Sequence, residues 1–255
     1  MTSIILFQCY IEANNDRLCK RISKKMHSSS TINLSHSGTL MPCDIRCLTL
    51  FLSKTSTKQW KVLDLSNCLI GDDGLRMLHE AFITSDIIID QIFLEGNSLT
   101  SQSSVVITEI ASSCKTKKLH IPYNTFTDGL DLSNNSTLEK LYIYNNKVSS
   151  TGAGRIFTTL TSNKKSMLRE LKIYGNSIDD EAVNDITQFL TGNNILEQFS
   201  LLFNCFSVQG KVKILRSLHN NQTLKELLIG TCNENPEIMA EINGLQSKRP
   251  KLGIY

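Results

Sequence analysis

The stretch LYIYNNKV, residues 141–148, alternates the apolar side chains of Leu141 and Ile143 with the rings of Tyr142 and Tyr144. Such alternation predicts a β-strand with one buried face and one open face. The arrangement returns along the chain in a frame that we write L-x-L-x-x-[N/C]-x-[apolar] and number from position 1. The first position is occupied by Ile32, Leu63, Ile92, Leu119, Leu141, Leu171, Phe199 and Leu227.

Successive frames begin 31, 29, 27, 22, 30, 28 and 28 residues apart. A strand frame that returns with a period of about 20–29 residues is the signature of leucine-rich repeats. Between frames, apolar residues are spaced as on one helix face, over residues 71–82 and again over residues 179–190. Each repeat is therefore predicted to be a strand followed by a helix, and Asp72 or Asp73 is expected to cap the first of these two helices.

The step of 22 residues between Leu119 and Leu141 is the shortest and leaves little room for a helix. We expect a tight turn or a 3₁₀ segment in its place.

One strand and one helix cannot bury their own apolar stripe, whereas stacked repeats share a continuous core. The sequence therefore predicts an α/β leucine-rich-repeat solenoid of about eight repeats, a horseshoe with parallel strands on its concave face and helices on its convex face. Residues 1–28 are expected to form a helical flank that caps the first repeat, and residues 29–255 to form the repeat domain.

In every frame but the first, where Ser37 stands, the sixth position carries an amide or a thiol at the turn that leaves the strand. A side-chain amide there can bond backbone groups that would otherwise be buried without partners, and Cys can replace it as a small weak donor. We interpret these residues as a structural turn ladder with no catalytic role: Cys68, Asn97, Asn124, Asn146, Asn176, Asn204 and Cys232.

Side chains between the buried strand positions are predicted to line the concave face. Aromatic residues with polar tips are enriched at protein–protein contacts, and this face of solenoids is commonly used for binding. We therefore expect a protein or peptide ligand at Phe93, Glu95, His120, Tyr123, Tyr142, Tyr144, Lys172, Tyr174 and Phe203. The alternative is that neighbouring tyrosines only stack on one another along the sheet.

Composition argues against several other classes of protein. The 27 Lys and Arg residues barely outnumber the 24 Asp and Glu residues, which does not indicate a nucleic-acid or membrane partner. The eight cysteines are scattered without metal-ligand spacing, so we expect no metal and no cofactor, and a cytoplasmic location. The five histidines are spread over different repeats, and no nucleophile has a partnered base at readable spacing, so we expect no enzyme.

The N-terminal half resembles animal NOD-like (NACHT-LRR) receptors. Leu6, Phe7, Cys9, Glu12 and Ala13 match an LFxCxxEA-type segment that joins the NACHT module to the repeats. An LxPxD stretch and a Trp-led LDLSxCxIGDxG unit follow, through Leu40, Pro42, Asp44, Trp60, Leu63, Asp64, Leu65, Ser66, Cys68, Ile70, Gly71, Asp72 and Gly74. Later repeats, near 28 residues, resemble the ribonuclease-inhibitor-like type.

The resemblance implies the ligand-sensing or autoinhibitory repeat region of an innate-immune receptor. It also implies an upstream NACHT ATPase domain as a partner. No G-x-x-x-x-G-K-[ST] phosphate loop occurs in this sequence, so we expect either a fragment of a longer receptor or a free-standing relative.

Other proteins with similar repeats are alternatives, because they regulate enzymes or select substrates. A Ran GTPase activator has a strongly acidic tail, whereas this chain ends in the basic stretch QSKRPKLGIY. Ribonuclease inhibitors are strongly acidic, whereas this chain has a net charge of +3. A ubiquitin-ligase substrate adaptor is a third alternative, although no F-box-like stretch precedes Ile32. The sequence does not identify the ligand.

Overall fold

The computed structural model describes residues 30–54, 58–230 and 235–255. The expected N-terminal flank, residues 1–28, and Cys232 of the expected ladder lie outside the described residues. The chain divides into two compact units, Met1–Asn124 and Thr125–Tyr255, and the boundary falls within the short step between Leu119 and Leu141.

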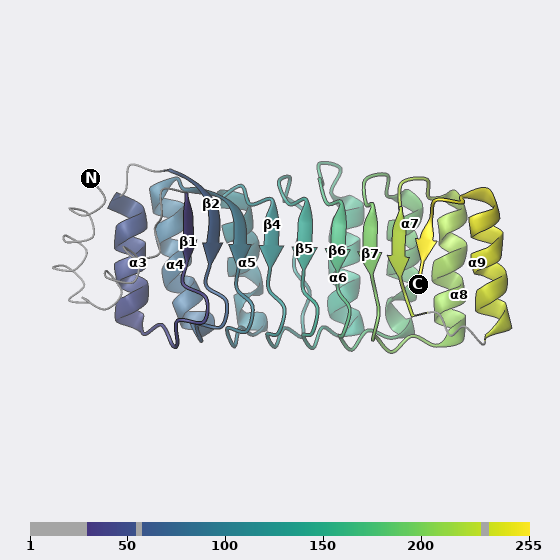
Figure 1. Ribbon diagram of the computed structural model, residues 1–255, viewed down its shortest axis with the longest axis horizontal. Helices are drawn as coiled ribbons and strands as arrows, with labels where there is room; N and C mark the ends of the chain where they lie inside the picture. Colours follow the sequence, from purple (N-terminus) through teal and green to yellow (C-terminus); the bar gives the residue numbers. More distant parts are fainter. Residues whose placement is uncertain (1–29, 55–57, 231–234) are drawn as a thin grey trace. The chain divides into compact units, whose positions relative to one another are not determined.

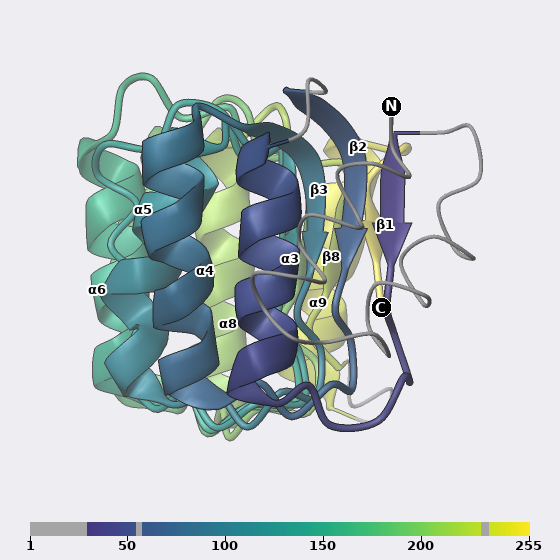
Figure 2. The same cartoon turned by 90° about the vertical axis from the view of Figure 1, so that its left-hand side faces the viewer.

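The first unit alternates parallel strands with helices that cover one face of the strands (Figure 2). Strand pairing aligns Ile32 with Leu63, Leu63 with Ile92, and Ile92 with Leu119, so the first frame positions form one row. The elements are β1 (Thr31–Asn33), α3 (Pro42–Lys54), β2 (Gln59–Asp64), α4 (Gly71–Ser85), β3 (Ile88–Phe93), η1 (Ser101–Ser103), α5 (Ser104–Ser113) and β4 (Lys118–His120).

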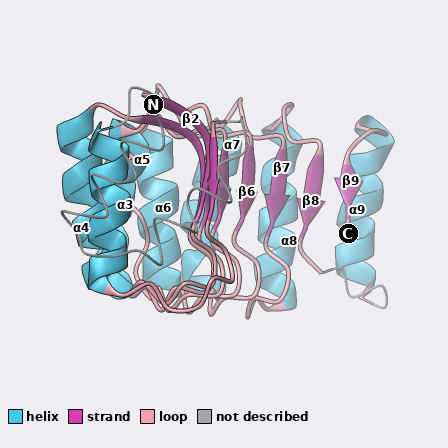
Figure 3. Ribbon diagram, turned by 60° about the vertical axis from the view of Figure 1, so that its left-hand side comes forward, coloured by secondary structure: helices cyan, strands magenta, loops and turns pink. Residues whose placement is uncertain are grey.

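The second unit repeats this alternation, with strands β6 to β9 lying side by side in front of the helices (Figures 1 and 3). Leu141 aligns with Leu171, Leu171 with Phe199, and Phe199 with Leu227. The elements are β5 (Lys140–Tyr142), α6 (Ser150–Ser162), β6 (Glu170–Lys172), η2 (Asp180–Ala182), α7 (Val183–Gly192), β7 (Gln198–Ser200), α8 (Val208–Ser217), η3 (Leu218–Asn220), β8 (Glu226–Leu228), α9 (Pro236–Lys248) and β9 (Gly253–Ile254).

The core of each unit lies between its strands and its helices. Frame positions 1 and 3 point into it, and Leu141 and Ile143 are both 0% exposed. The helical stripes predicted from the sequence are confirmed: α4 buries Leu75, Leu78 and Phe82, and α7 buries Val183, Ile186 and Leu190. In the repeats that contain a helix, the strand and the helix therefore share one apolar layer.

The short repeat at the start of the second unit has turns in place of a helix. No helical segment, α or 3₁₀, occurs between Thr125 and Glu139, all of which the structure describes, so only the expectation of a turn is confirmed. Gly129 packs directly against the first turn of α6, where an added Cβ would lie 1.9 Å from the carbonyl oxygen of Gly152. The loop comes this close because neither position carries a side chain.

Asp72 does not cap its own helix, and that prediction is wrong. The start of α4 has no side-chain cap. The Asp72 carboxylate instead accepts hydrogen bonds from the Thr100 amide (2.9 Å) and hydroxyl (2.7 Å), and from the Ser103 hydroxyl. The residue therefore ties the start of α4 to the start of the next helix, an interaction between repeats that a local capping rule does not foresee.

The turn ladder is a column of fully bonded side-chain amides. The Oδ1 atom of Asn97 accepts from the amides of Cys68 (3.1 Å) and Ile70 (3.3 Å), and its Nδ2 donates to the carbonyls of Leu65 (2.8 Å) and Glu95 (3.2 Å). Later members likewise accept from a backbone amide of the preceding repeat and donate to strand carbonyls: Asn124, Asn146, Asn176 and Asn204. Each such amide thus bonds two consecutive turns.

The residue before each ladder position that the structure describes adopts a left-handed conformation. The φ values at this fifth frame position lie between 49° and 63°, at His36, Asn67, Gly96, Tyr123, Asn145, Gly175 and Phe203. Gly and Asn tolerate this region best. The backbone must turn here so that the following side chain reaches into the ladder.

A second column of amides marks the turns that precede the strands of the second unit. The Nδ2 of Asn163 donates to the carbonyls of Leu132 and Asn135, and that of Asn221 donates to the carbonyls of Leu190 and Asn193. The sequence reasoning missed this column. The signal was the return of Asn at positions 135, 163, 193 and 221, close to the repeat period.

Replacement of Asn97 by Ala is expected to leave several backbone groups buried without partners. Because each orphaned group costs about 1–3 kcal/mol, the free energy of unfolding should fall by about 3 kcal/mol or more. Urea denaturation of the purified chain measures the change. Asn194→Ala, at an exposed turn position, is the matched control and should shift stability by less than about 0.5 kcal/mol. Equal shifts for the two variants would contradict a special role for the ladder.

Candidate protein-binding face

We define the open face as the side of the strands that points away from the helices. It carries frame positions 2 and 4, and position 0, the residue before the frame. In the first unit, the Phe93 ring lies 5.3 Å from the His120 ring, and the Nζ of Lys118 lies 5.0 Å from the centre of the Phe93 ring. The Nδ1 atom of His120 is 3.7 Å from a carboxylate oxygen of Glu95. Three predicted contact residues, Phe93, Glu95 and His120, are thus brought together.

A buried carboxylate organises the open face of the second unit. Glu170, at position 0 of its repeat, is 5% exposed. The Nζ atoms of Lys140 and Lys172 lie 2.7 Å and 3.0 Å from its two oxygens, and the Tyr142 hydroxyl donates to it at 2.8 Å. The Lys172 ammonium also lies 4.8 Å from the centre of the Tyr142 ring. We call these four residues the Glu170 cluster.

The charges of this cluster follow from its contacts. Burial alone would raise the pKa of Glu170, but hydrogen bonds from Lys140, Lys172 and Tyr142 lower it to about 2. Burial, together with the bond to the Glu170 carboxylate, raises the pKa of Tyr142. At neutral pH one carboxylate therefore faces two ammonium groups and a neutral phenol, which leaves a net positive charge.

The tyrosines of the open face differ in exposure. Tyr142 shares position 2 with Lys172 but is only 8% exposed, so it supports the cluster and offers little surface to a partner. The rings of Tyr144 and Tyr174 stack at 4.4 Å and within 7° of parallel. The sequence analysis gave two alternatives for these tyrosines, contact with a ligand or stacking on one another, and this pair is stacked. The pair remains half-buried, with part of its surface toward solvent.

Two predicted contact residues, Tyr123 and Phe203, project from the ends of their strands. They are 55% and 80% exposed, and both occupy the left-handed fifth frame position. A non-glycine residue in this conformation costs about 1–2 kcal/mol. These aromatic residues therefore stand where Gly or Asn would fold more easily.

Sequence reasoning missed Glu170 and Lys140 as site residues. Both lie at position 0, one residue before the apolar frame that drew attention to each strand. The signal was the opposite charge of two residues that strand pairing places side by side. Their proximity becomes visible only when the register between repeats is known.

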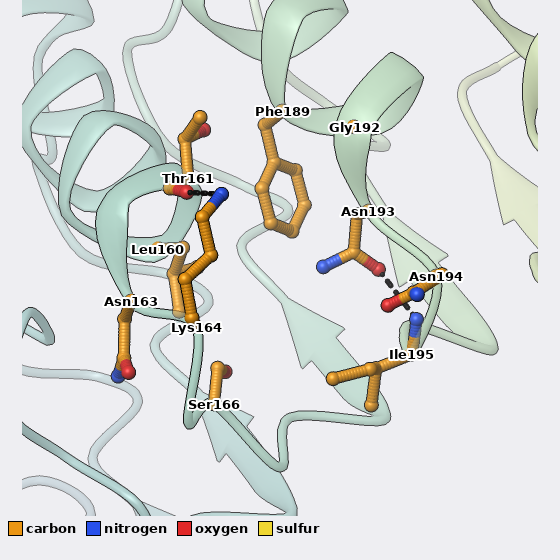
Figure 4. A pocket seen from close by; sticks show the side chains of 10 residues that line it. All are labelled: Leu160, Thr161, Asn163, Lys164, Ser166, Phe189, Gly192, Asn193, Asn194 and Ile195. Carbon is orange, nitrogen blue, oxygen red and sulfur yellow. Dashed lines mark hydrogen bonds between the residues drawn. The ribbon is translucent and has the colours of Figure 1, made fainter.

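A cavity of about 310 Å³ lies at the turns that follow α6 and α7 (Figure 4). Its lining is Leu160, Thr161, Asn163, Lys164, Ser166, Phe189, Gly192, Asn193, Asn194 and Ile195. Its polar groups bond to the chain itself: the Lys164 ammonium donates to the Thr161 carbonyl (3.1 Å), and the Asn193 side chain accepts from the Ile195 amide (3.0 Å). The cavity is therefore a product of turn packing, and we place the candidate site on the open face.

Within residues 30–54, 58–230 and 235–255, no group of three or more His, Cys, Asp or Glu side chains is arranged to hold a metal ion. In the same part of the chain, no helix has the length and apolar character needed to cross a membrane.

The repeating strand, amide-bearing turn and helix define an α/β leucine-rich-repeat solenoid of the ribonuclease-inhibitor-like type. The chain is 24% identical to mouse ribonuclease inhibitor and 23% identical to the pig protein, in each case over 219 residues and 84% of this chain. It spans 43% of the length of each of these curated relatives.

Other comparisons add little to this assignment. No family model matches the chain. A solved structure titled leiomodin-1 actin-binding site 2 is 18% identical and covers 68% of this chain and 87% of its own, with a TM-score of 0.48, too low to support an argument.

Substitution of Glu170 by Gln is expected to lower the free energy of unfolding at pH 7 by about 1–3 kcal/mol, because bonds to a charged group are lost. The folded-state pKa, about 2, lies below the value of 4.5 expected for an unperturbed carboxyl. The stabilisation is therefore complete above pH 4.5 and is lost as the pH falls toward 2.

Urea midpoints at pH 7 and pH 3 test this linkage. The difference between wild type and Glu170→Gln should shrink to about half or less at pH 3. Glu237→Gln, which removes an exposed ion pair with Arg216, is the control and should cost less than about 1 kcal/mol. If the stability difference between wild type and Glu170→Gln is the same at both pH values, the charge of the Glu170 carboxylate does not contribute to stability.

Proposed function

We propose that this chain is a non-catalytic protein-binding module that holds a protein or peptide ligand on the open face of its strands. The observation that carries the proposal is the open face of the second unit, where aromatic and cationic side chains, several of them solvent-exposed, lie together. Aromatic residues supply most binding hot spots, and solenoids of stacked repeats offer extended surfaces for partners.

The similarity to ribonuclease inhibitor supports a binding role at the level of the fold. That protein is named for inhibiting an enzyme, and only part of its length is matched here. Its target does not transfer readily, because the net charge of +3 and the positive Glu170 cluster would oppose a basic enzyme. We therefore propose the mode of action, protein binding, without that target.

Loss of the stacked pair is expected to weaken ligand binding. Peptides selected from a random phage-displayed library on the immobilised chain should bind Tyr144→Ala/Tyr174→Ala at least about tenfold less tightly, because aromatic hot spots contribute about 2 kcal/mol or more. Biolayer interferometry with synthetic peptides measures the affinities.

The matched control is Arg155→Ala/Thr158→Ala, two exposed positions on α6. Peptides that lose affinity for the control to the same degree, or that bind both double variants like wild type, would place the binding site away from the open face. A library that yields no binder would count against the proposal itself.

At a finer level, we propose a cytoplasmic repeat region of a NOD-like innate-immune receptor, with ligand-sensing or autoinhibitory activity. Support comes from the matched motif residues, several of which have clear structural roles. Gly71 is left-handed at φ 61°, and an added Cβ at Gly74 would lie 2.5 Å from Ile45. Because these roles build the repeat, they favour this type of repeat and leave the receptor role to a separate test.

The receptor proposal predicts a NACHT ATPase encoded in frame with this chain. Full-length sequencing of the transcript is the measurement, and a G-x-x-x-x-G-K-[ST] phosphate loop upstream is the expected result. A transcript that encodes these repeats alone would overturn the receptor role and leave the binding module intact.

A further inference from the structure

Phe203 is the most exposed large apolar side chain among the described residues, at 80%. It also occupies the left-handed fifth frame position, where the two repeats that contribute the Tyr144–Tyr174 stack have Asn145 and Gly175. Neither feature stabilises the fold: the conformation is unfavourable for a bulky residue, and the ring is left in water. The turn ladder accounts for the backbone conformation at this position, but it does not account for an exposed aromatic side chain there.

The cations of the Glu170 cluster indicate the chemistry of a partner. Lys140 and Lys172 are 47% and 37% exposed, and each ammonium has three donors, of which the Glu170 carboxylate takes one. Both ammonium groups are therefore partly exposed on two adjacent strands, beside a carboxylate that neutralises only one of the two charges. An acidic side chain is the complementary group.

The spacing between these features can be estimated from strand geometry. Lys172 stands at position 2 of its repeat, and Phe203 at position 5 of the next. Three residues rise at most about 3.3 Å each, less in the turn that follows β7, and the strands lie about 4.8 Å apart, so their backbones are separated by at most roughly 11 Å. An extended peptide spans that distance in about three residues. The stacked Tyr144–Tyr174 pair, at position 4, lies between these two levels of the repeat.

We propose that the open face of the second unit binds an extended acidic peptide segment of a partner protein, whose carboxylate bonds Lys140 and Lys172 while an apolar side chain about three residues away packs against Phe203. The inference rests on the proposed binding function and specifies its ligand class. Phe203 acts as the apolar anchor, and the two lysines set the preference for acid.

The first test needs no ligand. Phe203→Asn places two asparagines at frame positions 5 and 6, with Asn204 as the second, as this chain already has at Asn145 and Asn146. Because Asn tolerates the left-handed region better than Phe, the variant should melt at a higher temperature, by about 2 °C or more. Differential scanning calorimetry measures the change. An unchanged or lower melting temperature would mean that Phe203 contributes to the fold, which overturns its role as a strained anchor.

The second test uses peptides from a random phage-displayed library selected on the wild-type chain. Selected peptides should have Asp or Glu about three positions from a large apolar residue. Their affinity should fall at least about tenfold for Phe203→Asn and about fivefold or more for Lys172→Gln. Lys164→Gln, an exposed lysine at the end of α6, is the control and should leave affinity unchanged.

The outcomes separate this inference from the broader proposal. Peptides that depend on Tyr144 and Tyr174 but not on Phe203 or Lys172, or that lack acidic residues, would overturn the inference and leave the binding face in place. Peptides indifferent to all four residues, or a library without binders, would overturn both.

Discussion

The turn that leaves each strand would bury backbone amides and carbonyls without partners if no side chain met them. The side-chain amide at the sixth frame position meets them, with Asn97 bonding four backbone groups across two repeats. This requirement also constrains the backbone before the amide and the register of the strands. The residue before it must be left-handed, and the apolar positions of neighbouring strands must align so that each amide reaches the turn before it.

The same requirement explains which parts of the fold were predictable. Apolar spacing and the ladder amide are local patterns that return with the repeat, so strands and helices could be located from the sequence alone. Asp72 was misread because its partners, Thr100 and Ser103, belong to the following repeat. The loop over residues 125–139 was foreseen only as too short for a helix. Its packing against α6 depends on Gly129 in the loop and Gly152 in the helix, which are far apart in the sequence.

On the binding face, the sequence indicates which side chains point away from the helices but not how exposed they are. Alternation indicates on which side of the strand Tyr142 lies, but its burial depends on Glu170 and Lys172 of the next strand. The tyrosine pair at 144 and 174 was foreseen as either a contact or a stack, and only register and rotamers distinguish the two. Phe203 was chosen for being aromatic, whereas its exposure and backbone conformation required coordinates.

Glu170 has a further consequence through its low pKa, about 2. The carboxylate therefore keeps its negative charge throughout mildly acidic solution. Glu170 consequently cannot serve as a proton-operated switch at such pH values. Any acid-triggered release of a molecule bound there would have to originate in a titrating group on that molecule.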